Sequence, residues 1–252
     1  MENKRIIYYK NLDSTNSEIK RLAMQGAEHG TVVVADSQTQ GKGRRGRNWE
    51  SPPGENIYMS VLLRADCTPD KAPMITLVMA YSVAEVLREL GFLDVQIKWP
   101  NDLVLSGKKV CGILTELQLK TSEIDYVVVG VGINVDTSEF PVELDGKATS
   151  LYLESGRLFD RETIVEKVIE FFERAYHQFM EEQDLSFLQE AYNTMLVNAG
   201  REVRVLDPSN EYTAYAQGIN SRGELMVTTL SGEEKAIYAG EVSVRGVYGY
   251  IR

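Results

Sequence analysis

The chain has 252 residues, 43% of them hydrophobic and 25% charged, and its formal net charge is −10. This composition is typical of a globular protein with a sizeable core, and the acidity argues against general nucleic-acid binding. No apolar run reaches the roughly 18 residues of a membrane span, and the N-terminus lacks the apolar segment of a signal peptide. The two cysteines, Cys67 and Cys111, cannot build a disulfide framework, so we expect a cytoplasmic protein.

Residues for metal or triad chemistry are scarce. Only two histidines occur, His29 and His177, and neither lies in a cluster with cysteines. A structural zinc site needs four such ligands, and a serine hydrolase of the common type needs a histidine together with a G-x-S-x-G turn. The sequence therefore argues against a metal site and against a serine hydrolase.

The N-terminal part of the chain alternates between strand-like and helix-like segments. Residues 14–17 offer several N-caps for a helix that ends near Met24, and Gly91 is suited to end a second helix over residues 71–90. A third, long helix is predicted over residues 161–182, with Asp160 as its N-cap and one apolar face. Strands are predicted at residues 6–9, 31–35, 57–63, 95–98, 103–105, 109–119 and 126–135.

The pattern changes after about Asn198. Five short β-prone runs follow within about fifty residues, separated by turn signals such as residues 208–210 and 221–223. Such a run of short strands is typical of a small β-barrel. We therefore predict an α+β domain over residues 1–198 and a small barrel over residues 199–252.

The segment GKGRRGRNW, residues 41–49, holds four cationic side chains and three glycines. Its glycines formally match the G-x-G-x-x-G dinucleotide fingerprint, but that motif must lead into a helix, which Pro52 and Pro53 forbid here. A P-loop is also excluded, because no Gly-Lys-Ser/Thr follows. Arginine forks and glycine amides suit a loop that wraps a phosphate-bearing ligand; a merely solvated basic loop is the alternative.

Three further stretches carry polar residues in apolar surroundings. In KWPNDL, Pro100 favours a bend at which Asn101 and Asp102 reach a ligand or only cap the turn. Lys109 enters a buried strand and therefore requires a nearby carboxylate or phosphate, and Gly112 leaves room for a ligand to approach the backbone. Asn134, in GVGINV, either bridges strands or contacts a ligand. The stretch DSTN, residues 13–16, has a strong alternative as a helix cap.

Together these motifs resemble the biotin protein ligase family. DSTN, QTQGKGRRGRNWESPPG, KWPNDL, KKVCGIL, GVGINV and GEVSVR occur in the family's order and spacing across nearly the whole chain. The resemblance implies a mixed sheet with flanking helices, as in class II aminoacyl-tRNA synthetases, followed by an SH3-like β-barrel. It also implies the monofunctional form, because DSTN begins at residue 13 and leaves no room for the DNA-binding domain of about sixty residues that some members carry.

The resemblance further implies a reaction. The family uses ATP, with Mg²⁺, to convert biotin into biotinyl-5′-AMP and pyrophosphate, and then transfers biotin to a lysine of a biotin carboxyl carrier domain. The implied acceptor is the carrier domain of acetyl-CoA carboxylase or a related carboxylase, and a homodimer is implied. No DNA and no membrane partner is expected, and no metal site beyond the Mg²⁺ that ATP brings.

The resemblance also implies a role for individual residues of this sequence that match the family's motifs. The resemblance implies catalytic roles for Lys109, Arg44 and Asp102. The implied biotin contacts are Ser14, Thr15, Gln38, Gly41, Lys42, Arg44, Lys109 and Gly112. The implied contacts to ATP and the adenylate are Arg44, Arg45, Arg47, Trp49, Asn101, Lys109, Asn134 and Arg245.

One residue departs from the family pattern. Lys42 stands where the bacterial pattern often has arginine, and lysine keeps the charge but loses the bidentate fork, so weaker ligand retention is expected. The alternative enzyme is a lipoate–protein ligase, which shares fold and adenylation chemistry. Its usual Arg-Arg-x-Ser-Gly-Gly-Gly loop is absent from this sequence.

Overall fold

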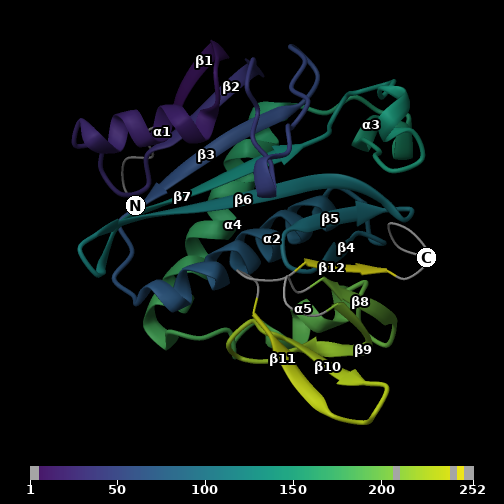
Figure 1. Cartoon of the computed structure of the whole chain (residues 1–252). Helices are drawn as coiled ribbons and strands as arrows, with labels where there is room; N and C mark the ends of the chain where they lie inside the picture. Colours follow the sequence, from purple (N-terminus) through teal and green to yellow (C-terminus); the bar gives the residue numbers. More distant parts are fainter. Residues whose placement is uncertain (1–5, 207–210, 239–242, 247–252) are drawn as a thin grey trace.

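The larger part of the protein is built on one mixed sheet. The computed structural model describes residues 6–206 and 211–238, and the backbone of residues 243–246. Seven strands lie in the order β1-β2-β3-β7-β6-β5-β4; β1 and β2 are parallel, and the other neighbours are antiparallel (Figure 1). The strands are β1 Ile6–Leu12, β2 Val32–Gln38, β3 Ile57–Leu63, β4 Gln96–Lys98, β5 Asp102–Leu105, β6 Lys108–Lys120 and β7 Glu123–Ile133.

Helices cover both faces of this sheet because its central strands are apolar on both sides. The helix α1 (Thr15–Met24) packs with Val33, Leu62 and Val128 in one cluster. The helices α2 (Ala72–Glu89) and α4 (Arg161–Glu182) belong to the larger cluster, which holds the alternate residues of the same strands, such as Val32 and Val129. Successive strand residues point to opposite faces, so the two clusters are separated by the sheet. The predicted mixed sheet with flanking helices is confirmed.

The long helix α4 begins and ends where the sequence predicts. Asp160 is its N-cap, and its side chain accepts a hydrogen bond from the Glu162 amide. Its predicted apolar residues are buried, apart from Ala175, which is partly buried against the same core. The helices α3 (Leu151–Ser155) and α5 (Gln189–Met195) were not predicted, since five and seven residues are too few to show a helical period.

A second, smaller sheet follows α5. It is antiparallel, in the order β11-β10-β9-β8-β12, and confirms the five predicted short strands. Its strands are β8 Glu202–Leu206, β9 Glu211–Ile219, β10 Leu225–Thr229, β11 Glu234–Ile237 and β12 Ser243–Gly246. Closure into a barrel and the domain boundary after residue 198 stay predictions, and the predicted turn at residues 208–210 lies outside the described residues.

The two sheets meet at the bend of the KWPNDL motif. Trp99 is 1% exposed, and its indole Nε1 donates a hydrogen bond to the Gly223 carbonyl, 3.0 Å away, in the turn between β9 and β10. The Trp99 amide donates to Asn198 Oδ1, and the Trp99–Pro100 peptide is cis. The bend that carries Asn101 and Asp102 therefore rests on the smaller sheet. Within the described residues, no helix combines the length and apolarity that a membrane crossing demands.

Candidate functional site

Three glycines leave part of the large sheet bare of side chains. Gly112 on β6 lies directly opposite Gly132 on β7, and Gly130 lies two residues away on the same face of β7. A Cβ atom at Gly132 would lie 2.5 Å from Trp49 Cε2, and one at Gly130 would lie 2.0 Å from Asn16 Oδ1. Both separations are shorter than van der Waals contact. The bare backbone is therefore required by the side chains that pack on it.

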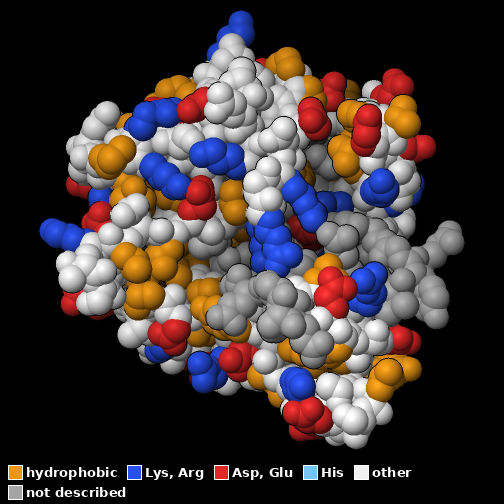
Figure 2. Space-filling model, in the orientation of Figure 1, with side chains coloured by type: hydrophobic (Ala, Val, Ile, Leu, Met, Phe, Trp, Pro, Cys, Tyr) orange, Lys and Arg blue, Asp and Glu red, His pale blue; other side chains and the backbone are white. Residues whose placement is uncertain are grey.

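A cavity lies over this glycine floor. Its walls come from the N-terminus of α1, the end of β2, residues 41–49, the KWPNDL bend, and the strands β6 and β7. The lining residues are Ser14, Thr15, Asn16, Gln38, Lys42, Gly43, Arg44, Trp49, Asn101, Lys109, Gly112, Ile113, Leu114, Gly130, Val131 and Gly132. Lys and Arg side chains gather across the middle of this face, although the protein as a whole is acidic (Figure 2).

Residues 41–49 fold back on themselves beside the cavity. The Gly43 amide donates to the Arg47 carbonyl, and the Trp49 amide donates to the Gly41 carbonyl. Arg45 lies at φ 58° between them, in a short 3₁₀ turn. A Cβ atom at Gly41 would lie 2.3 Å from the Trp49 carbonyl oxygen, so only glycine permits this closure.

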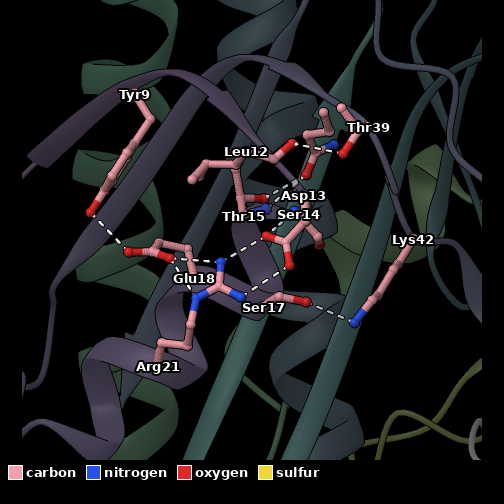
Figure 3. A network of polar contacts seen from close by, with 11 residues as sticks. Tyr9, Leu12, Asp13, Ser14, Thr15, Ser17, Glu18, Arg21, Thr39 and Lys42 are labelled. Atoms are coloured by element: carbon pink, nitrogen blue, oxygen red, sulfur yellow. Dashed lines mark hydrogen bonds and ion pairs between the residues drawn. The ribbon is translucent and has the colours of Figure 1, made fainter.

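Two cations attach this loop to the rest of the protein. Lys42 Nζ donates to Ser17 Oγ on α1, 2.8 Å away (Figure 3). Arg44 Nη1 donates to Asn101 Oδ1, also at 2.8 Å. Arg45 and Arg47 are exposed and do not line the cavity. Lys42 and Arg44 thus join the loop to α1 and to the KWPNDL bend, respectively.

A charged group of side chains surrounds Lys109. Lys109 Nζ lies 2.6 Å from Asp102 Oδ1, which belongs to the neighbouring strand β5. Asn101 Nδ2 donates to the same Asp102 oxygen and to the Ile113 carbonyl, which fixes the amide whose oxygen accepts from Arg44. Burial lowers the pKa of the Arg44 guanidinium, and Asp102 opposes this shift. We call Arg44, Asn101, Asp102 and Lys109 the charged group.

The Trp49 indole lies on the floor between these residues. Its ring atoms are those that a Cβ atom at Gly112 or Gly132 would meet, and Lys109 Nζ is 5.1 Å from the ring centroid. This distance is within the range of a cation–π interaction. Trp49 Nε1 is buried and has no hydrogen-bond partner among the described residues.

A neutral group lies at the N-terminus of α1. The Thr15 amide donates to Gln38 Oε1 at 2.8 Å, and the Thr15 hydroxyl donates to the same oxygen at 3.2 Å. Gln38 Nε2 donates to Ser51 Oγ. Ser14 is the N-cap residue, but its side chain makes no capping bond, so its hydroxyl is left for the cavity. We call Ser14, Thr15, Asn16 and Gln38 the neutral group.

Asp13 secures the start of this helix from outside the cavity. Its carboxylate accepts from the Ser14 amide at 2.7 Å and from both Arg21 Nη atoms, while Arg21 Nε donates to Glu18 (Figure 3). The hydrogen bonds from Arg21 lower the pKa of Asp13 to about 2.

Some residues suggested by the sequence do not line the cavity. Asn134 is 6% exposed, and its Nδ2 donates to the Thr149 carbonyl, so it bridges a strand end to a loop. Gly41 and Asp102 lie behind lining residues that they contact. Arg245 has its backbone in β12, but its side chain lies outside the described residues. The described residues include no cluster of His, Cys, Asp and Glu that could hold a metal ion.

Sequence reasoning missed Asn16 and Gly130 as cavity residues, together with Ser60 and Glu116, which contact Asn16. DSTN does contain Asn16, but Glu116 lies 100 positions further along the chain, and only the pairing of β6 with β7 brings it near. The only available signal was the spacing of the two glycines in GVGINV, which removes alternate side chains from one face of a strand.

The cavity therefore suits a ligand with two unlike ends. The neutral group offers amide and hydroxyl hydrogen bonds, and the charged group offers two cations. Asn16 lies over Gly130 and Trp49 over Gly132, so Asn16 and the indole beneath Lys109 are about 7 Å apart along the strand. Such an arrangement fits a neutral polar head, a flat middle and an anionic tail.

Comparison with known proteins agrees with this description. The profile of the biotin/lipoate A/B protein ligase family matches residues 8–134, and that of the biotin protein ligase C terminal domain matches residues 199–245. The bifunctional ligase/repressor BirA of Bacillus subtilis is 35% identical over 243 residues, which are 95% of this chain and 74% of that protein. The biotin–[acetyl-CoA-carboxylase] ligase of Mycobacterium tuberculosis is 30% identical over 91% of this chain and 85% of its own.

One solved structure is similar to this chain over the whole length of the solved chain. The biotin protein ligase of Aquifex aeolicus, in complex with biotin and ATP, superposes with a TM-score of 0.84 at 34% sequence identity. The match covers 97% of this chain and 100% of that one, so it includes both sheets.

Proposed function

This chain belongs to the biotin protein ligase family, and we propose that it uses ATP to attach biotin to a lysine of a biotin carboxyl carrier domain, through biotinyl-5′-AMP. The observation that carries the proposal is the cavity with unlike ends. Biotin has a neutral ureido head, a compact bicyclic ring and a carboxylate tail, which correspond to the neutral group, the glycine floor and the charged group. Relatives of this chain are named as ligases of this kind.

The ureido head would bind at the N-terminus of α1. Ser14 has a hydroxyl that is not used for capping, and Thr15 and Gln38 are held together by their own hydrogen bonds. Gly112 would allow the ring to approach the backbone, and Gly41 and Lys42 would close the loop over it. These contacts match those that the family resemblance implies.

Adenylation would take place beside the charged group. A carboxylate oxygen of biotin attacks the α-phosphorus of ATP, a new C–O–P bond forms, and the bond to pyrophosphate breaks. Two anions approach one another in this step, so fixed cations lower its barrier. Arg44 and Lys109 are those cations. Before ATP binds, Asp102 at 2.6 Å from Lys109 Nζ balances the ammonium charge of this partly buried lysine.

The nucleotide would extend from this point across Trp49 and Asn101. Arg45 and Arg47 would reach its phosphates from the exposed side of the loop, and Asn134 and Arg245 complete the contacts that the family resemblance implies. Mg²⁺ would enter with ATP and neutralise the triphosphate. The mixed anhydride is prone to hydrolysis, so closure of residues 41–49 would protect it from water.

Transfer to the carrier completes the reaction. The ε-amine of the carrier lysine attacks the acyl carbon of biotinyl-5′-AMP, an amide bond forms, and AMP leaves. Asp102 would accept the proton of the attacking amine, once the phosphate has taken its place beside Lys109. The acceptor would be the carrier domain of acetyl-CoA carboxylase or a related carboxylase.

The remaining features of the proposal concern assembly and location. We propose a homodimer in the cytoplasm, on the family resemblance and on the scarcity of cysteine, with a closed SH3-like barrel formed by the smaller sheet. The net charge of −10 supports a protein rather than DNA as partner. A gel-shift assay at physiological salt would test for DNA binding, and sedimentation with and without biotin and ATP would test for the dimer.

The decisive experiment is transfer of labelled biotin. Purified protein is incubated with ATP, Mg²⁺, labelled biotin and an isolated carrier domain, and the label is located by mass spectrometry. We expect one modified lysine, no labelling without ATP, and none on a carrier whose acceptor lysine is replaced by arginine. Labelling with lipoate but not with biotin would instead support the lipoate–protein ligase alternative, which shares the family profile.

A further inference from the structure

Asn101 and Asp102 are carried by a short hairpin at the edge of the large sheet. The strands β4 and β5 have three and four residues, and the pairing of Lys98 with Asp102 closes the loop of residues 99–101. β5 also pairs with β6, whereas β4 is the last strand of the sheet. A two-stranded hairpin of this size is barely stable by itself, so its loop needs support from outside the sheet.

The segment that leads into the smaller sheet supplies part of this support. The Val197 amide donates to the Ile97 carbonyl at 2.9 Å, so this segment lies along the outer edge of β4. The next residue, Asn198, is buried, and its Oδ1 accepts from the Trp99 amide at 3.0 Å. The first residue of the hairpin loop is therefore held through its backbone.

The Trp99 indole supplies a second point of attachment. Its Nε1 donates to the Gly223 carbonyl at 3.0 Å, although the two residues lie 124 positions apart in the chain. Gly223 is buried in the turn between β9 and β10 and adopts φ 72°. A Cβ atom there would lie 3.0 Å from side-chain carbons of both Leu77 and Leu185, so the turn lies directly against the larger core.

The turn that receives the indole is itself held in place. Asn220 Oδ1 accepts from the Arg222 amide, and the Gly223 amide donates to the Asn220 carbonyl. The Leu185 amide donates to the Ser221 carbonyl at 2.7 Å. The Gly223 carbonyl is thus an acceptor at a fixed position, so the hydrogen bond that it accepts sets where the hairpin loop lies.

The other end of the same loop contacts the cations of the cavity. Asn101 Oδ1 accepts from Arg44 at 2.8 Å, and Asp102 Oδ1 lies 2.6 Å from Lys109 Nζ. Only one residue separates Trp99 from Asn101. A displacement of the indole therefore moves the amide that holds Arg44 and the carboxylate that holds Lys109.

We propose that Trp99 is a positioning residue through which the smaller sheet places Arg44 and Lys109 for adenylation. Trp99 does not line the cavity, so it acts through Asn101 and Asp102. The inference rests on the proposed function, in which Arg44 and Lys109 are the cations at the reacting phosphate. Attachment of the indole should affect the chemical step and leave the neutral group unchanged, because that group lies on α1 and at the end of β2.

The test begins with Trp99→Phe, which removes the indole N–H but keeps an aromatic ring in the core. Asn101 retains its two hydrogen bonds to Ile113, so the loop should shift rather than unfold. The kcat is measured by biotin-dependent pyrophosphate exchange, and the Kd for biotin by calorimetry. We expect kcat to fall about 10- to 100-fold, as for a reacting group misplaced by about 1 Å, and the Kd for biotin to stay within about twofold.

Two further variants disturb the same support from the smaller sheet and from the segment before it. Gly223→Ala places a methyl group against Leu77 and Leu185 at a positive φ, so it should displace the turn and lower kcat in the same way. Asn198→Ala removes the acceptor of the Trp99 amide and should also lower kcat without weakening biotin binding.

Phe179→Leu is the control for a merely structural role. Phe179 is fully buried on α4, so its truncation should lower the midpoint of urea denaturation while kcat stays at the wild-type value. The inference is overturned by an unchanged kcat in Trp99→Phe and Gly223→Ala, or by an equal loss of kcat in the control. A Kd for biotin that rises as much as kcat falls would also overturn it. If wild-type protein catalyses no biotin-dependent exchange, the proposed function fails instead, so the two failures are distinguishable.

Discussion

The two ends of the cavity are built on different principles. In the neutral group, the side chains that line the cavity carry no charge, and the nearest ions are a carboxylate and a lysine, Glu116 and Lys20, which lie behind Asn16 and do not line the cavity. In the charged group, the ions themselves line the cavity or touch the residues that do, and Lys109 pairs directly with Asp102.

This difference indicates which end of the cavity must exchange its contacts during a reaction. A neutral hydrogen-bonding site can stay as it is when a neutral head binds, because its polarity is already set. The charged group must exchange partners, since an anion that binds Lys109 competes with Asp102. We therefore expect substitutions in the charged group to affect the rate of adenylation, and substitutions near the neutral group to affect biotin affinity.

The largest expected effect follows from Lys109→Met. Removal of the ammonium eliminates a cation at the reacting phosphate, so biotin-dependent pyrophosphate exchange should fall by about 10²–10³-fold. Biotin affinity should change much less, which is the contrast between the two ends. Lys108→Met, on the same strand, is the control and should retain exchange. Undiminished exchange in Lys109→Met would remove Lys109 from the mechanism.

Arg44→Gly should produce the next largest effect. Its loss releases the contact between residues 41–49 and Asn101, so the adenylate should escape before it reaches a carrier. We expect labelling of unrelated proteins to rise about tenfold or more, as for a lost charge-assisted contact. The readout is biotin incorporated into bovine serum albumin, with the exposed Arg174→Met as control. Leakage at the wild-type level would show that Arg44 does not retain the intermediate.

Gly130→Ala tests the floor beneath the neutral group. The new methyl group would overlap Asn16 Oδ1, so we expect a loss of about 1–3 kcal/mol in the free energy of unfolding and weaker biotin binding. Asn16→Ala shortens the opposing side chain, so in that background Gly130→Ala should cost little further stability. Urea denaturation of the four proteins measures the coupling, and equal losses in both backgrounds would contradict the predicted overlap.

The smallest effect concerns Asp13. Its hydrogen bonds from Arg21 lower its folded-state pKa to about 2, from an unfolded value of about 4. A lowered carboxyl pKa stabilises the fold above the unfolded pKa, and this contribution is lost as pH falls from about 4 to about 2. Because the pair is largely solvent-exposed, we expect Asp13→Asn to cost less than about 1 kcal/mol at pH 7. Denaturation curves should show a smaller difference in unfolding free energy between wild type and Asp13→Asn at pH 2.5 than at pH 7.

Local patterns predicted most elements of the fold. Asp160 and the apolar face of α4 are readable because a helix repeats its contacts every few residues, and Gly91 adopts the positive φ expected after a helix. The helices α3 and α5 were not predicted because neither is long enough to show the helical repeat of apolar residues. The parallel pairing of β1 with β2 also could not be read from short β-prone runs, since the partner of a strand is not encoded in the strand alone.

In the site, too, local motifs were predictable and contacts between distant segments were not. Motifs indicated Lys109, Arg44 and Thr15, because charged and polar residues next to glycine or within an apolar strand are unusual. The contacts among Asn16, Ser60 and Glu116 join three distant segments, and each residue is ordinary in its own surroundings. Their arrangement depends on the register of β3, β7 and β6, which no single segment reveals.

The protein has two tryptophans, and they differ in a way that gives the molecule a built-in optical signal. Trp99 is 1% exposed and lies between the two sheets, so its emission should be constant. Trp49 lies on the glycine floor beneath Lys109, where any ligand that fills the cavity must displace it or stack against it. A fluorescence titration of Trp99→Phe would therefore follow occupancy through one indole alone, without a label and without turnover.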